Sequence, residues 1–307
     1  MKSKILLTGA SGFIGNRVYR LLKLNHCSVK VLARKFNDAY EDLYIIDLEK
    51  DEIKEEIFDG ITSVIHLAGY AHDLKNNPSK LNKFEKLNYE ASIALARAAF
   101  QSGVKNFTFI SSVKAAGILQ NDHKEIIDEE FSSGVFDPYG ESKRKTELKL
   151  LDLSKNFNAR VNILRPTLTY GKDVKGNLRK MINGIKAGWF PKLPDMQNKK
   201  SLVHVDDLAR AILFIHFNEE TKDEIFIVSD GNFYSSKIIH DSIKKAFNLK
   251  NFSLYLPFFL IRALSLIPKF KDQINKLQNN EPFSSEKLKK IGFDSKFNLE
   301  NLNETIF

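Results

Sequence analysis

The sequence predicts an α/β fold in which a doubly wound parallel sheet carries helices on both faces and is joined by a smaller C-terminal substrate-binding lobe. Short runs of β-branched and apolar residues recur at 4–8, 28–33, 43–47, 62–67, 106–111 and 160–164. Between them lie amphipathic segments, at 13–24, 51–58, 80–102 and 138–156. A crossover between parallel strands needs a dozen or more residues, so this alternation favours a parallel sheet over hairpins.

The second half of the chain interrupts this alternation. A loop-rich stretch at 167–201 contains one helical pattern near 175–187, and 231–307 is mostly helical and irregular. Between these two excursions, a helix at 206–217 and a strand at 224–228 return to the pattern of the sheet. We therefore predict a discontinuous layout. The core domain would comprise 1–166 with 202–230, and the lobe 167–201 with 231–307.

The composition argues against several classes of protein. With 307 residues and 43% hydrophobic content, the chain can bury a large core. The net charge of +9 comes from lysines spread over nearly every predicted helix, whereas a nucleic-acid partner would need a clustered basic and aromatic face. A single cysteine, Cys27, cannot form an intramolecular disulfide, and we predict no metal site. No apolar stretch is long enough for a spanning helix or a signal peptide, so we expect a cytoplasmic protein.

One hydrophobic segment needs separate consideration. The stretch from Phe252 to Ile267 is the most hydrophobic of the chain, but Pro257 and Arg262 interrupt it, and it is too short to span a bilayer. We expect it to be buried in the C-terminal lobe, with peripheral membrane contact as the alternative.

A glycine-rich turn follows the first predicted strand. Glycines at every third position, Gly9, Gly12 and Gly15, lie between this strand and the next predicted helix. Such glycines let the backbone approach a pyrophosphate, and the helix behind them presents unpaired N–H groups and a positive dipole end. We therefore predict a dinucleotide site. Its backbone also includes the residues between the glycines, Ser11, Phe13 and Ile14.

The end of the second predicted strand should select the cofactor. An acidic residue there would accept the ribose 2′-hydroxyl of NAD, and an arginine would suit the 2′-phosphate of NADP. The sequence has Arg34 and no acid, so we predict NADP, with NAD as the alternative. Asp47, followed by Leu48 after the third predicted strand, is a candidate contact for the adenine end.

Three further residues predict catalysis. Ser112 follows the fifth predicted strand at its carboxyl end, where ligands meet open parallel sheets. Tyr139 and Lys143 are four residues apart, so they share one face of the predicted helix 138–156. A tyrosine ionises near pH 10 and needs a neighbouring positive charge to act as an acid or base near neutrality. We predict that Tyr139 exchanges a proton with the substrate oxygen, that Lys143 lowers its pKa and holds the ribose, and that Ser112 hydrogen-bonds the reacting oxygen.

With these motifs, the chain resembles the extended short-chain dehydrogenase/reductases, the NAD-dependent epimerase/dehydratase family of nucleotide-sugar enzymes with a Rossmann fold. The resemblance runs nearly end to end. It comprises the Thr8–Gly15 turn, His66–Gly69, Asn88, Ser111–Ser112 with Gly117, the Tyr139/Lys143 pair, Leu164–Pro166 with Tyr170–Gly171, and Leu202–Asp207.

The resemblance implies further cofactor residues. It implies that Leu67, Ala68, Gly69 and Pro166 line the dinucleotide, and that Asn88 belongs to this site and supports the active-site helices.

The resemblance also implies a substrate site and an assembly. Asn177 and Leu178 resemble a segment that meets the diphosphate of a UDP-sugar, and Lys200 stands where many members have an arginine that pairs with phosphate. A lysine offers a point charge in place of a bidentate clamp. A homodimer through the helices 80–102 and 138–156 is implied as well.

The residues around the predicted site narrow the reaction. Dehydratases of this family carry an Asp-Glu pair after the catalytic serine or threonine, whereas this chain has Val113-Lys114. Epimerases that act beside a ketone often use a cysteine, and Cys27 lies near the second predicted strand, away from the site. Both reactions are therefore disfavoured.

Two reactions at C4 of the sugar remain. We favour a reductase of UDP-4-keto-6-deoxy-N-acetylhexosamines in surface-polysaccharide biosynthesis, because of Arg34 and the resemblance of Ser112–Gly117 to such reductases. The alternative is a UDP-glucose or UDP-N-acetylglucosamine 4-epimerase. An alternative of another class is a non-enzymatic dinucleotide sensor, but such relatives lose the Tyr/Lys pair that this chain retains.

Overall fold

The computed structural model describes residues 4–71, 82–119, 125–250, 254–301 and 303. The chain divides into two units. The first comprises Met1–Ile118, Glu129–Pro166 and Leu208–Val228, and the second comprises Leu119–Asp128, Thr167–Asp207 and Ser229–Phe307. Residues 119–128, 202–207 and 229–230, which we expected in the core domain, group with the second unit. Strand pairing holds 200–204 there, and Ile127 forms a bridge with Phe283 of the same unit.

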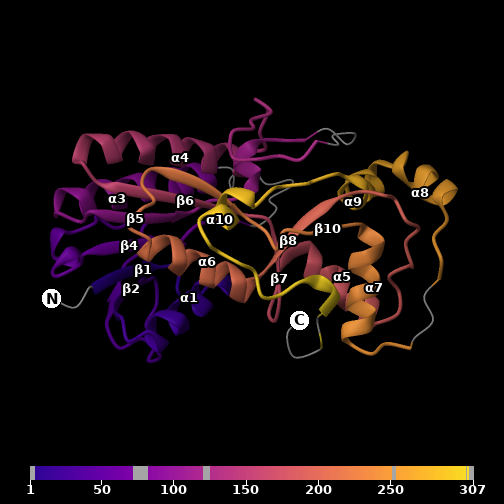
Figure 1. Ribbon diagram of the computed structural model, residues 1–307, viewed down its shortest axis with the longest axis horizontal. Coiled ribbons are helices and arrows are strands. Elements are labelled where there is room, and N and C mark those ends of the chain that lie inside the picture. Colours follow the sequence, from indigo (N-terminus) through magenta and orange to yellow (C-terminus); the bar gives the residue numbers. More distant parts are fainter. Residues whose placement is uncertain (1–3, 72–81, 120–124, 251–253, 302, 304–307) are drawn as a thin grey trace. The chain divides into compact units, whose positions relative to one another are not determined.

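A seven-stranded sheet forms the centre of the first unit (Figure 1). Its strands follow the order β3-β2-β1-β4-β5-β6-β9, and every neighbouring pair is parallel. The strands are β1 (Lys4–Thr8), β2 (Ser28–Ala33), β3 (Leu43–Ile45), β4 (Ser63–His66), β5 (Asn106–Ile110), β6 (Arg160–Pro166) and β9 (Glu224–Val228). The order reverses between β1 and β4, which is the switch point where ligands bind open parallel sheets.

Helices cover both faces of this sheet, as predicted. In Figure 1, α3 (Ala91–Gln101) and α4 (Pro138–Phe157) lie on one face, and α1 (Phe13–Leu24) and α6 (Val205–Phe217) lie on the other. Apolar side chains such as Leu95 and Leu150 fill the layer between sheet and helices. The 3₁₀ turn η3 (Val113–Ala116) follows β5.

Two predicted helices differ from the structure. Only η1 (Glu55–Phe58) of the expected helix 51–58 is helical, because this one 3₁₀ turn already buries Ile57 and Phe58 in the core. The expected helix 80–102 begins outside the described residues, and a π-helical stretch, η2 (Phe84–Glu90), precedes α3.

A buried ion pair fixes α4 to the sheet. The Arg165 guanidinium on β6 donates to both carboxylate oxygens of Glu147 on α4, at 3.0 and 2.7 Å, and both side chains are fully buried. Arg165 Nη1 also donates to the carbonyl of Glu129, at 3.2 Å. The two parallel hydrogen bonds fix the position and the rotation of α4, which is the helix that carries Tyr139 and Lys143.

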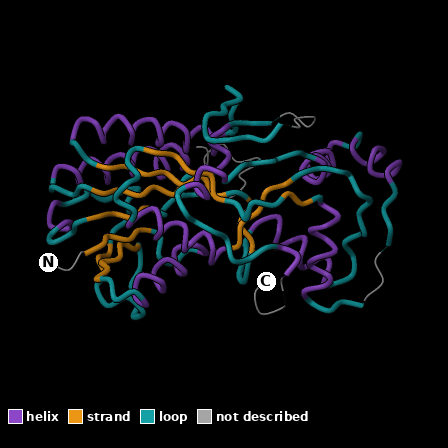
Figure 2. The backbone as a smooth tube through the Cα atoms, viewed as in Figure 1, coloured by secondary structure: helices purple, strands orange, loops and turns teal. Residues whose placement is uncertain are grey.

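The second unit contains a small sheet that we did not predict, because we expected 167–201 and 231–307 to be loop-rich and helical. Strand β8 (Lys200–His204) pairs in parallel with β7 (Leu168–Tyr170) and antiparallel with β10 (Phe233–Tyr234). Figure 2 shows the long loops on either side of these short strands. The helices of this unit are α5 (Gly176–Lys186), α7 (Ser236–Ala246), α8 (Phe258–Ser265), α9 (Pro268–Gln278) and α10 (Glu286–Lys290), and a 3₁₀ turn, η4 (Leu299–Asn301), follows them.

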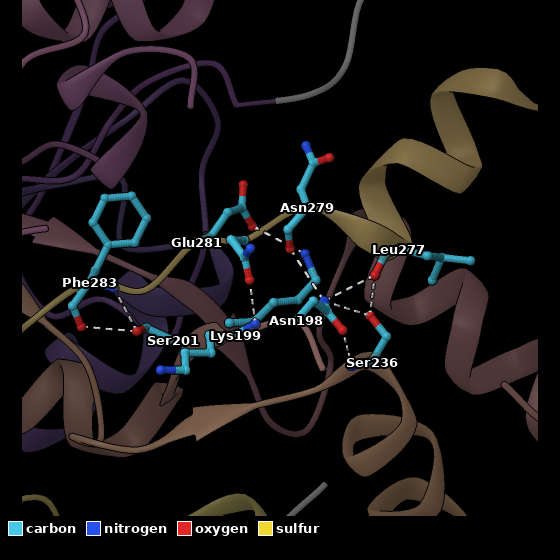
Figure 3. Close-up of polar contacts among 10 residues, drawn as sticks. Asn198, Lys199, Ser201, Ser236, Leu277, Asn279, Glu281 and Phe283 are labelled. Carbon is cyan, nitrogen blue, oxygen red and sulfur yellow. Dashed lines mark hydrogen bonds and ion pairs between the residues drawn. The ribbon is translucent and has the colours of Figure 1, made fainter. Parts of the chain in front are cut away.

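Polar contacts join the end of α9 to β8 (Figure 3). The buried Asn198 donates from Nδ2 to the carbonyls of Leu277 and Asn279, at 3.1 and 3.3 Å. Further along, Glu281 N donates to the carbonyl of Lys199, and its own carbonyl accepts from Ser201 N. Residues 277–283 therefore run along 198–201 as a hydrogen-bonded strap that fixes the end of α9.

The prediction that the hydrophobic segment 252–267 is buried is wrong. Phe252 lies outside the described residues, but Leu254, Phe259 and Leu266 are 70%, 70% and 80% exposed. Only Ile261 of α8 is buried. Hydrophobicity alone does not distinguish a core helix from one that faces outward. No helix among the described residues is long and apolar enough to cross a membrane.

Candidate active site

The glycine turn joins β1 to α1 in a conformation that only glycine accommodates. Gly9 has φ +75°, and a Cβ there would lie 2.7 Å from the backbone nitrogen of Ala68. A Cβ on Gly15 would lie 2.1 Å from the carbonyl oxygen of Gly9. Gly12 caps α1, and its N–H donates to the Gly9 carbonyl at 2.9 Å. The turn is therefore drawn tightly against the end of β4.

The N-terminus of α1 is open to an anion. No side chain caps it, and its first turn contains no acidic residue. Ser11 is exposed, and Phe13 and Ile14 are half-buried. The first N–H groups of a helix have no partner within the helix, and its dipole favours negative charge at this end. The turn thus fits the pyrophosphate of a dinucleotide.

A buried histidine connects β1, β4 and α3 beside this turn. His66 Nδ1 lies 2.7 Å from the hydroxyl of Thr8, and its Nε2 lies 2.8 Å from the hydroxyl of Ser92. Burial, with a smaller effect from the charge of Lys143, lowers the pKa of His66 to about 3, so the ring is neutral. The Thr8 hydroxyl also accepts from the Ala68 N–H at 3.0 Å. The network holds residues 67–69, which we expected at the cofactor, next to the glycine turn.

Asn88 occupies the centre of a second network, as its predicted supporting role requires. It is fully buried in η2, and its Oδ1 accepts from Tyr70 N at 2.7 Å. Its Nδ2 donates to the carbonyl of Tyr70 and to the hydroxyl of Ser142 on α4, at 3.0 and 3.1 Å. The Asn88 carbonyl accepts from Thr146, also on α4, at 2.9 Å. One side chain therefore ties the loop after β4 to the catalytic helix.

Ser112 and Tyr139 meet where η3 approaches α4. Asp137 caps α4 by accepting from the Gly140 N–H at 2.7 Å, and Pro138 occupies its first turn. A Cβ on Gly140 would lie 2.3 Å from the Lys114 carbonyl oxygen, so α4 and η3 are in direct contact. Burial raises the pKa of Tyr139 to about 12, and a hydrogen bond with Ser112 opposes that shift.

Lys143 points into the same region from the next turn of α4. Its Nζ donates to the carbonyl of Ile110 at 2.9 Å and lies 4.5 Å from the ring centroid of Phe109. A Cβ on Gly69 would lie 3.5 Å from this Nζ and 3.1 Å from Asn88 Oδ1. Burial lowers the pKa of Lys143 to about 8, while Glu147 opposes the shift.

The first unit thus brings together the predicted catalytic residues and several predicted cofactor residues. Lys143 lies beside Gly69 and Asn88, and Ser112 contacts Tyr139. Tyr70 and Ser142, which complete the network of Asn88, were not predicted as site residues. Ser111 was not assigned a role either, and its hydroxyl is buried and has no hydrogen-bond partner among the described residues.

The remaining predicted cofactor residues lie at strand ends. Arg34 is exposed directly after β2, in the position that the cofactor argument requires. Asp47 is half-buried after β3 and accepts from Glu49 N at 3.2 Å, and Leu48 packs against the core. Pro166 is buried at the end of β6, opposite Val228 of β9.

The predicted substrate residues belong to the second unit. Asn177 is exposed in the first turn of α5, and Leu178 beside it is buried. Lys200 is buried at the start of β8, with its Nζ 3.6 Å from a carboxylate oxygen of Glu281. This ion pair gives the buried ammonium of Lys200 a counter-charge within the second unit.

The chain is similar to known proteins over most of its length. The model of the NAD dependent epimerase/dehydratase family matches residues 5–229. The UDP-glucose 4-epimerase of Vibrio cholerae is 28% identical over 285 residues, which cover 90% of this chain and 86% of that protein. An Escherichia coli O157:H7 protein, N-acetyl-alpha-D-glucosaminyl-diphospho-ditrans,octacis-undecaprenol 4-epimerase, is 26% identical over 84% of this chain and 76% of its own length.

Solved structures confirm the fold class. The UDP-glucose 4-epimerase of Thermotoga maritima superposes with a TM-score of 0.78 at 23% identity, covering 97% of this chain and 95% of that one. The Thermus thermophilus UDP-glucose 4-epimerase in complex with NAD gives a TM-score of 0.75 at 21% identity, over 97% and 96%. Since the family model spans well over half of the chain, the protein belongs to the NAD-dependent epimerase/dehydratase family of enzymes.

Proposed function

We propose that the protein transfers a hydride at C4 of a diphosphate-linked sugar and that its net reaction is 4-epimerisation. The observation that carries the proposal is the grouping of Ser112, Tyr139 and Lys143 beside the loop at Gly69. The similarity to UDP-glucose 4-epimerases supports C4 as the reacting carbon. We further propose a homodimer through α3 and α4.

The chain fits a nicotinamide dinucleotide as its cofactor. Gly9, Gly12 and Gly15 leave room for a pyrophosphate, and the uncapped start of α1 offers it N–H donors. Lys143 and the loop at 67–69 would hold the nicotinamide ribose. When bound, the nicotinamide supplies hydride chemistry, which no side chain can provide.

The side chains would then control the proton. Tyr139 would take the proton from the sugar hydroxyl at C4 and return it at the end of the reaction. Ser112 would hydrogen-bond the same oxygen and keep it aligned with Tyr139. Lys143 would favour the ionised tyrosine through its positive charge. We propose that Asn177, Leu178 and Lys200 contact the diphosphate.

A second candidate reaction is the reduction of a UDP-4-keto-6-deoxy-N-acetylhexosamine with NADPH. Arg34 favours it, because a guanidinium at the end of β2 suits a 2′-phosphate and no acid stands there for a 2′-hydroxyl. A reductase consumes its cofactor at each turnover, whereas an epimerase regenerates it.

One experiment separates the two reactions. The nucleotide that leaves the denatured purified protein is identified, and UDP-galactose, UDP-N-acetylgalactosamine and a UDP-4-keto sugar are offered with and without NADPH. We expect retained NAD and interconversion of the C4 epimers without added cofactor. Turnover of the 4-keto sugar only with NADPH would establish the reductase, and no turnover of either class would refute hydride transfer at C4.

The role of Tyr139 has its own test. We expect Tyr139→Phe to lower turnover by about a hundredfold or more, because the general acid–base group is lost while the ring packing against Phe84 remains. The dinucleotide content of the purified protein should stay unchanged. Tyr44→Phe, which removes a hydroxyl bonded to the exposed Glu56, is the matched control. Turnover of Tyr139→Phe within about fivefold of the unmodified enzyme would exclude Tyr139 as the proton carrier.

A further inference from the structure

The second unit exposes a set of large apolar side chains around α8. We call Leu254, Tyr255, Phe258, Phe259, Leu266 and Ile267 the α8 surface. Each of them is at least 44% exposed, and Leu266 reaches 80%. Scattered exposed hydrophobic residues are normal, but six within 14 residues of sequence form a concentration that commonly marks an interaction site.

The helix turns its apolar side outward. Phe258, Arg262 and Leu266, the residue that caps α8, follow one another at intervals of four residues on one side of the helix. Phe259 and the exposed Ala263 lie next to them, so this side is mostly apolar. The inward side has the buried Ile261, with Leu264 and Ser265 partly covered. An ordinary surface helix of a soluble protein has the opposite distribution, with polar residues on its outer side.

The exposed side chains of the α8 surface lie on a part of the second unit whose backbone is held by hydrogen bonds. Before α8, Lys192 N donates to the carbonyl of Leu254 at 2.9 Å, and Leu256 N donates to the carbonyl of Lys192 at 3.0 Å. After α8, the hydrogen bonds of Asn198 fix the end of α9 (Figure 3). Helix α9 packs on α8. The apolar side chains are therefore held outward by a fixed backbone.

The charged residues along this segment are positive as far as Lys271, and the exposed Asp272 follows it. The sequence contains no aspartate or glutamate from 242 to 271. Arg262, Lys269 and Lys271 are exposed within or just after α8, and none of the three forms an ion pair with another described residue. The surface thus combines apolar side chains with cations whose charge is not neutralised.

We propose that the α8 surface docks on an anionic lipid bilayer. Phe258, Phe259 and Leu266 would enter the boundary between headgroups and acyl chains, while Arg262, Lys269 and Lys271 would face lipid phosphates. A second copy of the chain is a poorer occupant, because a two-fold interface centred on the α8 surface would bring the three cations of one copy near the three cations of the other. The proposal does not depend on the reaction that the first unit catalyses.

Flotation of the full-length protein with lipid vesicles tests the proposal. We expect binding to vesicles of phosphatidylethanolamine with phosphatidylglycerol, and about tenfold weaker binding to phosphatidylcholine alone. The double variant Phe259→Ser/Leu266→Ser should lose about tenfold or more of the binding. The double variant Leu24→Ser/Phe36→Ser is the control, because these side chains are 73% and 75% exposed but lie in the first unit.

A charge variant and a solution measurement complete the test. Arg262→Gln/Lys269→Gln/Lys271→Gln should weaken binding to the anionic vesicles and reduce its dependence on salt. Circular dichroism of each variant confirms that the fold is retained. Failure of the unmodified protein to bind anionic vesicles would overturn the proposal, and so would equal losses in the two double variants. A dimer that dissociates on Phe259→Ser/Leu266→Ser, without vesicle binding, would overturn it in favour of a second copy.

Discussion

Lowering the pH from 8 to 5.5 should destabilise the folded chain through two buried histidines. His66 is held between Thr8 and Ser92, and His216 on α6 lies 2.9 Å from each of the hydroxyls of Ser63 and Thr108. Burial lowers the pKa of both rings to about 3, with smaller contributions from Lys143 and Arg160 respectively. Neither ring gains a proton in the folded chain at pH 5.5.

The size of the effect follows from proton linkage. The unfolded chain protonates each histidine below its ordinary pKa of about 6.5, whereas the folded chain does not until about pH 3, so stability falls as the pH drops below 6.5. At pH 5.5 each ring costs about 1.4 kcal/mol relative to pH 8, and the two together cost about 3 kcal/mol. Asp230, whose pKa burial raises to about 6, offsets part of this loss by binding a proton in the folded chain.

Urea unfolding of three histidine variants at pH 8 and pH 5.5 measures how much folding stability each histidine costs at the lower pH. His66→Gln keeps hydrogen-bonding groups within reach of Thr8 and Ser92 but cannot be protonated, so its loss of stability between pH 8 and 5.5 should be about 1.4 kcal/mol smaller than that of the unmodified chain. His216→Gln should behave alike, and His26→Gln, at an exposed position, should not differ from the unmodified chain. An unchanged pH dependence in both buried-site variants would refute the reasoning.

Three substitutions test other parts of the structure. Arg34→Ala should weaken NADPH binding selectively if Arg34 meets the 2′-phosphate, which titration with NADPH and NADH would reveal; equal losses would remove the cofactor preference. Glu147→Gln should lower the free energy of unfolding by about 3–5 kcal/mol, because it leaves the fully buried Arg165 without its counter-charge; a loss below about 1 kcal/mol would contradict that role. Gly15→Ala should abolish dinucleotide retention, because its Cβ would lie 2.1 Å from the Gly9 oxygen; full retention would contradict the assignment of the turn.

The parts of the fold predicted correctly are those with local signals. The strands of the large sheet are short segments rich in apolar and β-branched residues, and β1 and β2 begin and end at the predicted residues. The glycine turn joins two such elements within a few residues, so its conformation follows from sequence that is close by. The small sheet had no such signal, because β10 has two residues and β7 has three, and β8 becomes a strand only through pairing with distant segments.

The candidate site was predictable where a residue type implies its chemistry. Ser112, Tyr139 and Lys143 carry functional groups whose spacing suggested one site, and the structure places Ser112 against Tyr139 and Lys143 near Gly69. The residues that hold them could not be found in this way. Thr8 and Ser142 form hydrogen bonds with partners that are 58 and 54 residues away in the sequence. The sequence around a serine or threonine does not indicate which distant residue its hydroxyl will contact.

The electrostatics of the site indicate what the chain supplies and what must be added to it. In the chain alone the pKa of Tyr139 is raised to about 12, so near neutrality the hydroxyl keeps its proton. Lowering this pKa to about 7 requires about 7 kcal/mol of stabilisation of the ionised form. The ammonium of Lys143 donates to the Ile110 carbonyl, and burial lowers its own pKa to about 8. We therefore propose that positive charge and hydrogen-bond donors brought in by bound ligands lower the pKa of Tyr139, so that Tyr139 acts as a base only when the site is filled.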